Sequence, residues 1–165
     1  MTFLLVRVDD RLLHGQVIFG WGERLQPRCY LIADDQVASD VWEQDAYRAG
    51  APPGVRVEVR DLQTFTQSWN SHEDPGGTVV LIRGLEDLAR LHQGGFRPEG
   101  GINLGGRHAP AGSLELLAFL HLTPPEAAAL RTLIAEGVSL YAQELPGSPR
   151  YGSEILQARL TGLRE

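Results

Sequence analysis

The sequence predicts an α/β fold, a three-layer α/β/α sandwich around a mainly parallel sheet of about six strands. Several apolar or β-branched runs show no polar alternation, which is typical of parallel strands covered on both faces. Helical spacing of apolar residues falls between these runs, and strands that alternate with helices imply right-handed crossovers. With 165 residues, 42% of them apolar, residues 1–165 fit one domain of ordinary size.

Six short runs are the expected strands. The first lies near the N-terminus, and the last follows the longest helical pattern. They are residues 3–8, 29–33, 55–59, 78–82, 101–104 and 139–143.

Apolar residues at helical spacing indicate the helices that connect these strands. A first helix starts near Gly15, and a strong one begins at Pro124 with Thr123 as its N-cap and Gly137 closing it. The others are expected around residues 37–46, 62–69 and 85–91, with a final helix over 153–163.

Composition excludes several classes of function. The formal net charge of −6 argues against general nucleic-acid binding, which needs a basic surface. All 15 basic residues are arginine, so a lysine Schiff base or a P-loop lysine is excluded. A single cysteine, Cys29, cannot form an internal disulfide, and no run approaches the ~20 apolar residues needed to span a bilayer. We therefore expect a cytoplasmic protein.

The most informative segment is residues 7–17, RVDDRLLHGQV. It places His14 between Arg11 and Gly15, at the exit of the first expected strand and the entry to the first helix. In open α/β sheets, chemistry gathers at the carboxyl ends of strands. A neutral imidazole there can act as a nucleophile, so we predict that His14 is transiently phosphorylated.

The residues around His14 suit a phosphoryl group. Arg11 is the natural source of positive charge, and the amides at the helix start could hold phosphoryl oxygens. Either Asp9 or Asp10 could orient the imidazole. The alternative is that Asp10 merely caps a helix and His14 is a solvated loop residue. The expected phosphate-binding loop comprises Asp10, Gly15, Gln16 and Val17.

A second glycine-containing turn follows the fifth expected strand. Gly105, Gly106 and Arg107 could form an anion-binding nest or simply a tight turn. His108 could line the phosphoryl pocket or lie in a solvated loop. No spacing of His, Cys, Asp or Glu resembles a metal site, and no motif for an organic cofactor is present. We expect neither.

Segment 7–17 closely resembles the active-site signature of the enzyme IIB component of the mannose/fructose/sorbose branch of the bacterial phosphotransferase system. Weaker similarities follow in the same order along nearly the whole chain. They are LIADDQVA at 31–38, APPGV at 51–55, INLGG at 102–106 and the region 137–146.

The resemblance implies a phosphohistidine–sugar phosphotransferase. A phosphorylated IIA protein would donate to His14 at Nδ1, and His14 would pass the phosphoryl group to a sugar taken up through membrane IIC and IID components. Arg11 matches the family's phosphoryl-stabilising position. The family's parallel sheet, with the first strand in its interior, places Arg83 and residues 103–106 near His14.

Two alternatives stay open. The domain could be a regulatory phosphoacceptor that binds partners without phosphorylating sugar, or a small-molecule-binding domain whose His14 is never modified. The oligomeric state is also open. An apolar helix surface carrying Trp42 or Trp69 could join two copies of the chain.

Overall fold

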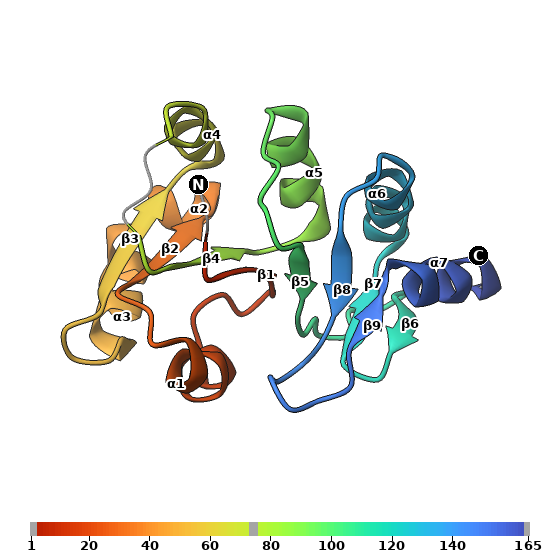
Figure 1. The fold of residues 1–165 in the computed structure, drawn as a ribbon, viewed down its shortest axis with the longest axis horizontal. Helices are drawn as coiled ribbons and strands as arrows, with labels where there is room; N and C mark the ends of the chain where they lie inside the picture. The colour runs from red at the N-terminus through yellow and green to blue at the C-terminus, as the bar shows by residue number, and fades with distance from the viewer. Residues whose placement is uncertain (1–2, 73–75, 164–165) are drawn as a thin grey trace.

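A seven-stranded sheet crosses the molecule (Figure 1). The computed structural model describes residues 3–72 and 76–163. Every neighbouring pair in the sheet is parallel except β8 and β9, which confirms the mainly parallel sheet. In spatial order the strands are β3 (Arg56–Arg60), β2 (Cys29–Ala33), β4 (Thr78–Ile82), β1 (Leu5–Val8), β5 (Ile102–Leu104), β8 (Leu140–Ala142) and β9 (Tyr151–Gly152).

Helices cover both faces of the sheet, as Figure 1 shows. Alternate residues of β1, β2 and β4 enter separate apolar cores, because successive side chains point to opposite faces. The first face carries η1 (Gln16–Trp21), α1 (Gly22–Leu25), α2 (Asp35–Ala38) and α3 (Val41–Gly50). The second carries α4 (Leu62–Asn70), α5 (Leu85–Gln93), α6 (Pro124–Ala135) and α7 (Ser153–Gly162). The three-layer prediction is confirmed.

The connections that leave β1 and its two neighbours lie on opposite faces of the sheet. From β1 the chain moves outward through β2 to β3 by helices of the first face, and then returns through β4, β5 and β8 by helices of the second face. The loop after β1 therefore turns to one face, while the loops after its neighbours β4 and β5 turn to the other. In open α/β sheets such a reversal creates a crevice at the carboxyl ends of the strands. His14 lies on the loop that follows β1.

Four features differ from the sequence prediction. An antiparallel hairpin of β6 (Leu114–Leu117) and β7 (Leu120–Leu122) precedes α6, and β9 adds an antiparallel edge. Neither the hairpin nor β9 was predicted from the sequence. The expected second helix is divided into α2 and α3, because Asp40 caps a new helix start through the amides of Trp42 and Glu43. The first helix begins as a π-helix, η1, and continues as α1.

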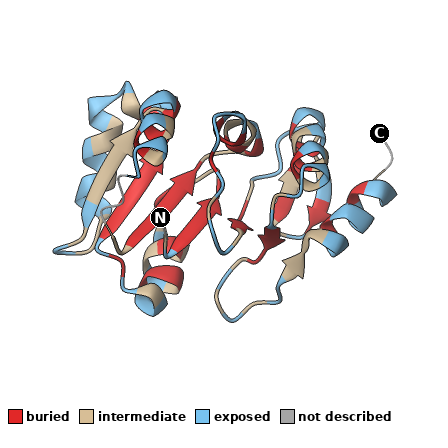
Figure 2. Cartoon of the chain, turned by 45° about the horizontal axis from the view of Figure 1, so that its top comes forward, coloured by how far each residue is buried: buried red, intermediate tan, exposed pale blue. Residues whose placement is uncertain are grey.

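Burial follows the layers. Strands β1, β2 and β4 are buried along their whole length, whereas edge strand β3 is less so (Figure 2). Trp69 packs edge-on against Phe96 and belongs to the second-face core, but Trp42 is 87% exposed. Within the described residues no helix is long and apolar enough to cross a membrane.

We expect Leu130→Ala to lower the free energy of unfolding by about 2–5 kcal/mol, because it opens a cavity in the second-face core. Leu130, on α6, is fully buried. The matched substitution Ile155→Ala, at a site on α7 that is 45% exposed, should change it by about 1 kcal/mol or less. Denaturant unfolding followed by circular dichroism measures both. Equal losses of unfolding free energy from the two substitutions would contradict the placement of Leu130 in the core and Ile155 at the surface.

Candidate functional site

The last residues of β1 bury a positive charge inside the sheet. Arg7 has no exposed surface, and its guanidinium donates to Asp9, to Asn103 on β5 and to the carbonyl oxygen of Gln143 after β8. The carboxyl ends of β1, β5 and β8 are thereby tied to one side chain. Burial lowers the pKa of Arg7, and the charge of Asp9 opposes that shift.

Asp9 is the centre of the site. Its buried carboxylate accepts from the side chains of Arg7 and Arg11, from the amide of Arg11 at 3.1 Å and from the amide of Gly106 at 3.2 Å. Burial alone would raise the pKa of Asp9. The hydrogen bonds from Arg11 and the charge of Arg7 outweigh burial, so the net pKa is lowered. Asp9 is therefore ionised at neutral pH.

The loop after β1 makes a left-handed turn at Leu12. Its φ is +55°, which a branched residue adopts at a cost of about 1–2 kcal/mol. The side chain of Leu12 is fully buried in the first-face core, which fixes the residue in this turn. Its carbonyl oxygen lies 2.9 Å from Nδ1 of His14.

This contact sets the tautomer of His14. A carbonyl oxygen can only accept, so Nδ1 carries the proton and Nε2 carries the lone pair. Nε2 is buried, lies 3.8 Å from Asp9 Oδ2, and has no hydrogen-bond partner in the described part of the chain. The His14 side chain is 18% exposed. The expected acceptor, Nδ1, is thus engaged in this conformation, and the ring must turn to present it.

Arg11 is fixed on one side and free on the other. Nε and Nη2 bind the carboxylate of Asp9, and Nη2 also donates to Gln16 Oε1 at 2.9 Å. Among the described residues, Nη1 has no partner. The side chain is 32% exposed, so one face of a positioned guanidinium is available to an anion.

The helix start after His14 supplies two open donors. The amides of Gly15 and Gln16 have no acceptor within residues 3–72 and 76–163. The amide of Val17 instead binds the carbonyl oxygen of His14 at 3.0 Å, and the Val17 side chain is a core residue. Two of the three predicted amides are therefore open.

Gly105 and Gly106 allow two arginines to pass close to the backbone. A Cβ on Gly105 would lie 2.5 Å from Arg7 Nη2, and one on Gly106 would lie 2.5 Å from Arg11 Nη2. Neither glycine has a positive φ, so the turn is not the αR–αL nest considered from the sequence. Their physical role is to let the two arginine side chains lie close to the backbone.

Asp10 faces away from the helix start. Its Oδ2 accepts from the amide of His108 at 3.1 Å and lies 3.0 Å from His108 Nδ1. Asp10 thus neither caps the first helix nor orients His14. Of the two aspartates considered, Asp9 is the one near the imidazole.

Arg107 and Arg83 are bound elsewhere. Arg107 Nε lies 3.0 Å from Glu126 Oε2, an ion pair without hydrogen-bond alignment, at the start of α6. Arg83 binds Asp34 at 2.7 Å and lies 3.6 Å from Glu43. The hydrogen bond to Asp34 raises the pKa of Arg83. Arg83 is paired within the β2–β4 cluster instead of pointing to His14.

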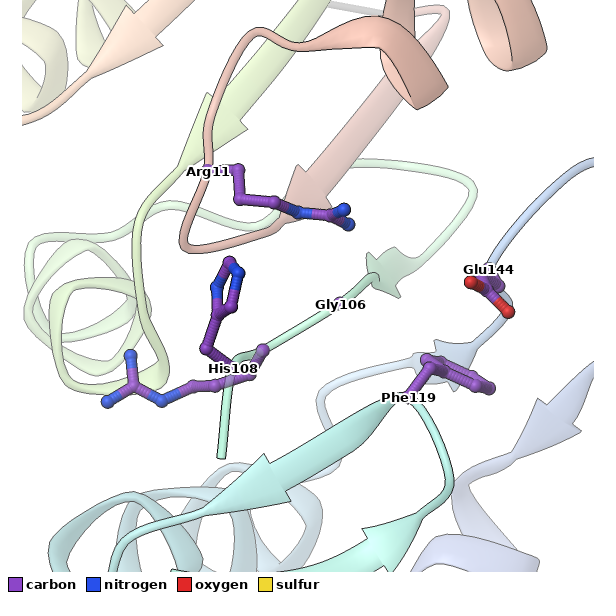
Figure 3. Close-up of a pocket in the computed structure, with 6 residues that line it drawn as sticks. Arg11, Gly106, His108, Phe119 and Glu144 are labelled. Atoms are coloured by element: carbon purple, nitrogen blue, oxygen red, sulfur yellow. The ribbon is translucent and has the colours of Figure 1, made fainter. Parts of the chain in front are cut away.

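A cavity of about 180 Å³ opens beside Arg11 (Figure 3). Sequence reasoning missed two of its residues, Phe119 and Glu144. Glu144 follows β8, two strands from β1, and accepts from Gln16 Nε2 at 3.0 Å. Its place at the carboxyl end of a parallel strand was an available signal; Phe119 lies in the unpredicted hairpin. The lining residues are Arg11, Gly106, Arg107, His108, Phe119 and Glu144.

The site is built for an anion and not for a metal. No group of three or more His, Cys, Asp or Glu side chains among the described residues could hold a metal ion. The open donors are one guanidinium nitrogen and two amides, all of which suit phosphoryl oxygens.

The sequence is similar to the sequences of known proteins. The chain is 28% identical over 151 residues to the mannose-specific EIIAB component of the PTS system of Escherichia coli K12, covering 91% of this chain and 46% of that protein. It thus spans about half the length of that relative. It is 29% identical over 150 residues to the sorbose-specific EIIB component of Klebsiella pneumoniae, covering 90% and 91% of the two chains.

A solved structure matches equally well. The crystal structure of the IIB domain of the sorbose permease of Klebsiella pneumoniae superposes with a TM-score of 0.85 at 27% identity, over 99% of both chains. The family model for the sorbose-subfamily IIB component of the PTS system matches residues 3–157. The chain therefore belongs to the sorbose-subfamily IIB components of the phosphotransferase system.

Proposed function

We propose that this chain is a cytoplasmic phosphocarrier that takes a phosphoryl group from a phosphohistidine on a IIA protein and passes it to a sugar. His14 is the acceptor, and no organic cofactor takes part. The observation that carries the proposal is the buried Asp9, which places Arg11 and the His14 loop together at the carboxyl end of β1.

Acceptance exchanges one N–P bond for another. A lone pair of the His14 imidazole attacks phosphorus, the N–P bond to the donor histidine breaks, and its electron pair returns to the donor ring. In the free chain Nδ1 donates to Leu12, so acceptance at Nδ1 requires the ring to leave that carbonyl and the proton to move from Nδ1 to Nε2 through solvent. The His14 side chain is 18% exposed and Nε2 has no hydrogen-bond partner among the described residues, so such a rotation breaks one hydrogen bond of the ring, the contact to Leu12.

Positioning and charge supply the catalysis. The transferred phosphoryl group has three equatorial oxygens, and charge accumulates on them in the transition state. Arg11 Nη1 and the amides of Gly15 and Gln16 provide three donors beside His14. Asp9 holds the guanidinium in place before the donor arrives, so little reorganisation is needed.

Membrane IIC and IID components are the proposed partners through which the sugar that receives the phosphoryl group is taken up, since the family acts within a phosphotransferase system. The competing regulatory role uses the same His14 chemistry and differs in having no sugar acceptor. Formation of a sugar phosphate separates the two. The exposed Trp42 keeps a homo-oligomer as a further proposal.

We expect His14→Asn to abolish labelling by a phosphorylated IIA protein, because the side chain loses its nucleophilic nitrogen. Mass mapping of the adduct under alkaline conditions measures this. The control is His72→Asn, at an exposed histidine with a φ of +58° that asparagine tolerates. Label on the His14→Asn chain would refute the assignment.

Arg11→Gln should slow single-turnover acceptance by about 10²–10³-fold, as removal of a preorganised transition-state donor commonly does. Rapid quench with phosphorylated IIA gives the rate. Arg24→Gln, at an exposed arginine on α1, removes the same charge away from the site and should leave the rate unchanged. A rate for Arg11→Gln equal to that of Arg24→Gln would reject the role of Arg11.

Alanine at the two adjacent glycines should give different defects. Gly105→Ala should lower the free energy of unfolding by about 2 kcal/mol or more, because Arg7 is buried and cannot move aside. Gly106→Ala should instead slow acceptance with a smaller loss of stability, because the half-exposed Arg11 is displaced. Thermal unfolding and rapid quench, applied to both variants, test this. The reverse pattern would contradict it.

A further inference from the structure

His108 and Asp10 form a pair that the phosphoryl acceptor does not use. Oδ2 of Asp10 lies 3.0 Å from His108 Nδ1, and the amide of the same histidine donates to it at 3.1 Å. Two contacts to one oxygen fix both the backbone and the ring of His108. The carboxylate holds a proton on Nδ1, so the lone pair of the neutral ring is on Nε2.

Nε2 of His108 is open to an incoming molecule. The side chain is 76% exposed, and Nε2 has no hydrogen-bond partner among the described residues. This is the opposite of His14, whose Nε2 is buried. An imidazole whose far nitrogen is held by a carboxylate is the usual arrangement of a general base.

The ring lines the same cavity as Arg11. Figure 3 shows His108 extending toward Arg11, with Glu144 and Phe119 across the opening. Arg11 shares Asp9 with the His14 ring, whose Nε2 lies 3.8 Å from that carboxylate. The cavity is therefore beside the phosphoryl acceptor and reaches the surface where a sugar could enter.

We propose that His108 is the general base for delivery, taking the proton from the sugar hydroxyl that attacks the phosphoryl group on His14. This inference rests on the proposed carrier function. Delivery needs such a proton acceptor, because a neutral hydroxyl becomes a phosphate ester oxygen. Kinases meet the same need with a carboxylate that accepts the hydroxyl proton.

Delivery exchanges the N–P bond of His14 for an O–P bond to the sugar. The sugar oxygen forms a bond to phosphorus, the N–P bond of His14 breaks, and its electron pair returns to the His14 ring. The hydroxyl proton moves to His108 Nε2. Asp10 stabilises the resulting imidazolium, and its second oxygen, Oδ1, is buried without a partner in the described part of the chain. The imidazolium then releases its proton to water.

Other charges around the cavity are consistent with this division of roles. Arg11 faces the developing phosphate charge, Arg107 is paired with Glu126, and Asp10 contacts the imidazole of His108. Glu144 is held by Gln16, on the far side of the cavity from His108 in Figure 3. His108 is thus the cavity residue with both a free lone pair and a carboxylate behind it.

The test separates acceptance from delivery. The full chain is labelled from phosphorylated IIA and then mixed with membrane vesicles from the cells that encode it, with mannose, fructose, sorbose and N-acetylgalactosamine as acceptors. We expect the His108→Asn chain to carry full label on His14 but to form sugar phosphate about 10²-fold more slowly. Asparagine keeps a donor toward Asp10 and removes the accepting nitrogen.

Two controls distinguish base catalysis from a structural role. His72→Asn should deliver at the rate of the unaltered chain. A His108→Ala chain should regain sugar phosphate formation when free imidazole is added, which a merely structural defect would not do.

Each remaining outcome rejects either the general-base proposal or the carrier function. Delivery by His108→Asn at the unaltered rate, or no rescue by imidazole, rejects the base. Label on His14 of the unaltered chain without any sugar phosphate also rejects it, and favours the regulatory role. No label on His14 of the unaltered chain rejects the carrier function itself.

Discussion

The carboxylate of Asp9 is the interaction on which the site depends. It is buried at the end of β1 and binds two guanidinium groups and two backbone amides. A buried charge is tolerated when it is paired and fully hydrogen-bonded, and removing one partner of such a pair typically costs about 3–5 kcal/mol. Two arginines share one aspartate, so this cluster keeps a net positive charge at the place where the proposed phosphoryl group would be held.

The same cluster links the order of the strands to chemistry. Arg7 contacts β5 through Asn103 and the loop after β8 through Gln143, so the loops that form the cavity are joined below it. Because the chain reverses direction at β1, the His14 loop leaves toward one face and the Gly105–Gly106 turn toward the other. The crevice between them is a consequence of topology, and the arginines set its charge.

Much of the fold follows from local sequence patterns, and the site follows only in part. Continuous apolar runs such as 78–82 identify buried parallel strands because both faces are covered. The segment 7–17 predicted His14 and Arg11 as site residues, and both lie beside Asp9 in the structure. The ion pair of Arg7 with Asp9 gave no local signal, since charges in a strand usually indicate an exposed edge. Glu144 and Phe119 reach the cavity through long-range packing, and the ring orientation of His14 depends on the φ of Leu12.

The site combines fixed and movable parts, and a carrier needs both. Arg7, Asp9 and Leu12 are fully or almost fully buried, so their positions are set by the core. Arg11, His14 and His108 retain exposed surface and have few contacts that must break before they act. Under the proposed function the chain meets one partner to accept and another to deliver, so the His14 ring would have to face two directions in turn. A rigid support with a partly exposed ring satisfies this requirement, because rotation of His14 leaves the hydrogen bonds of Asp9 intact.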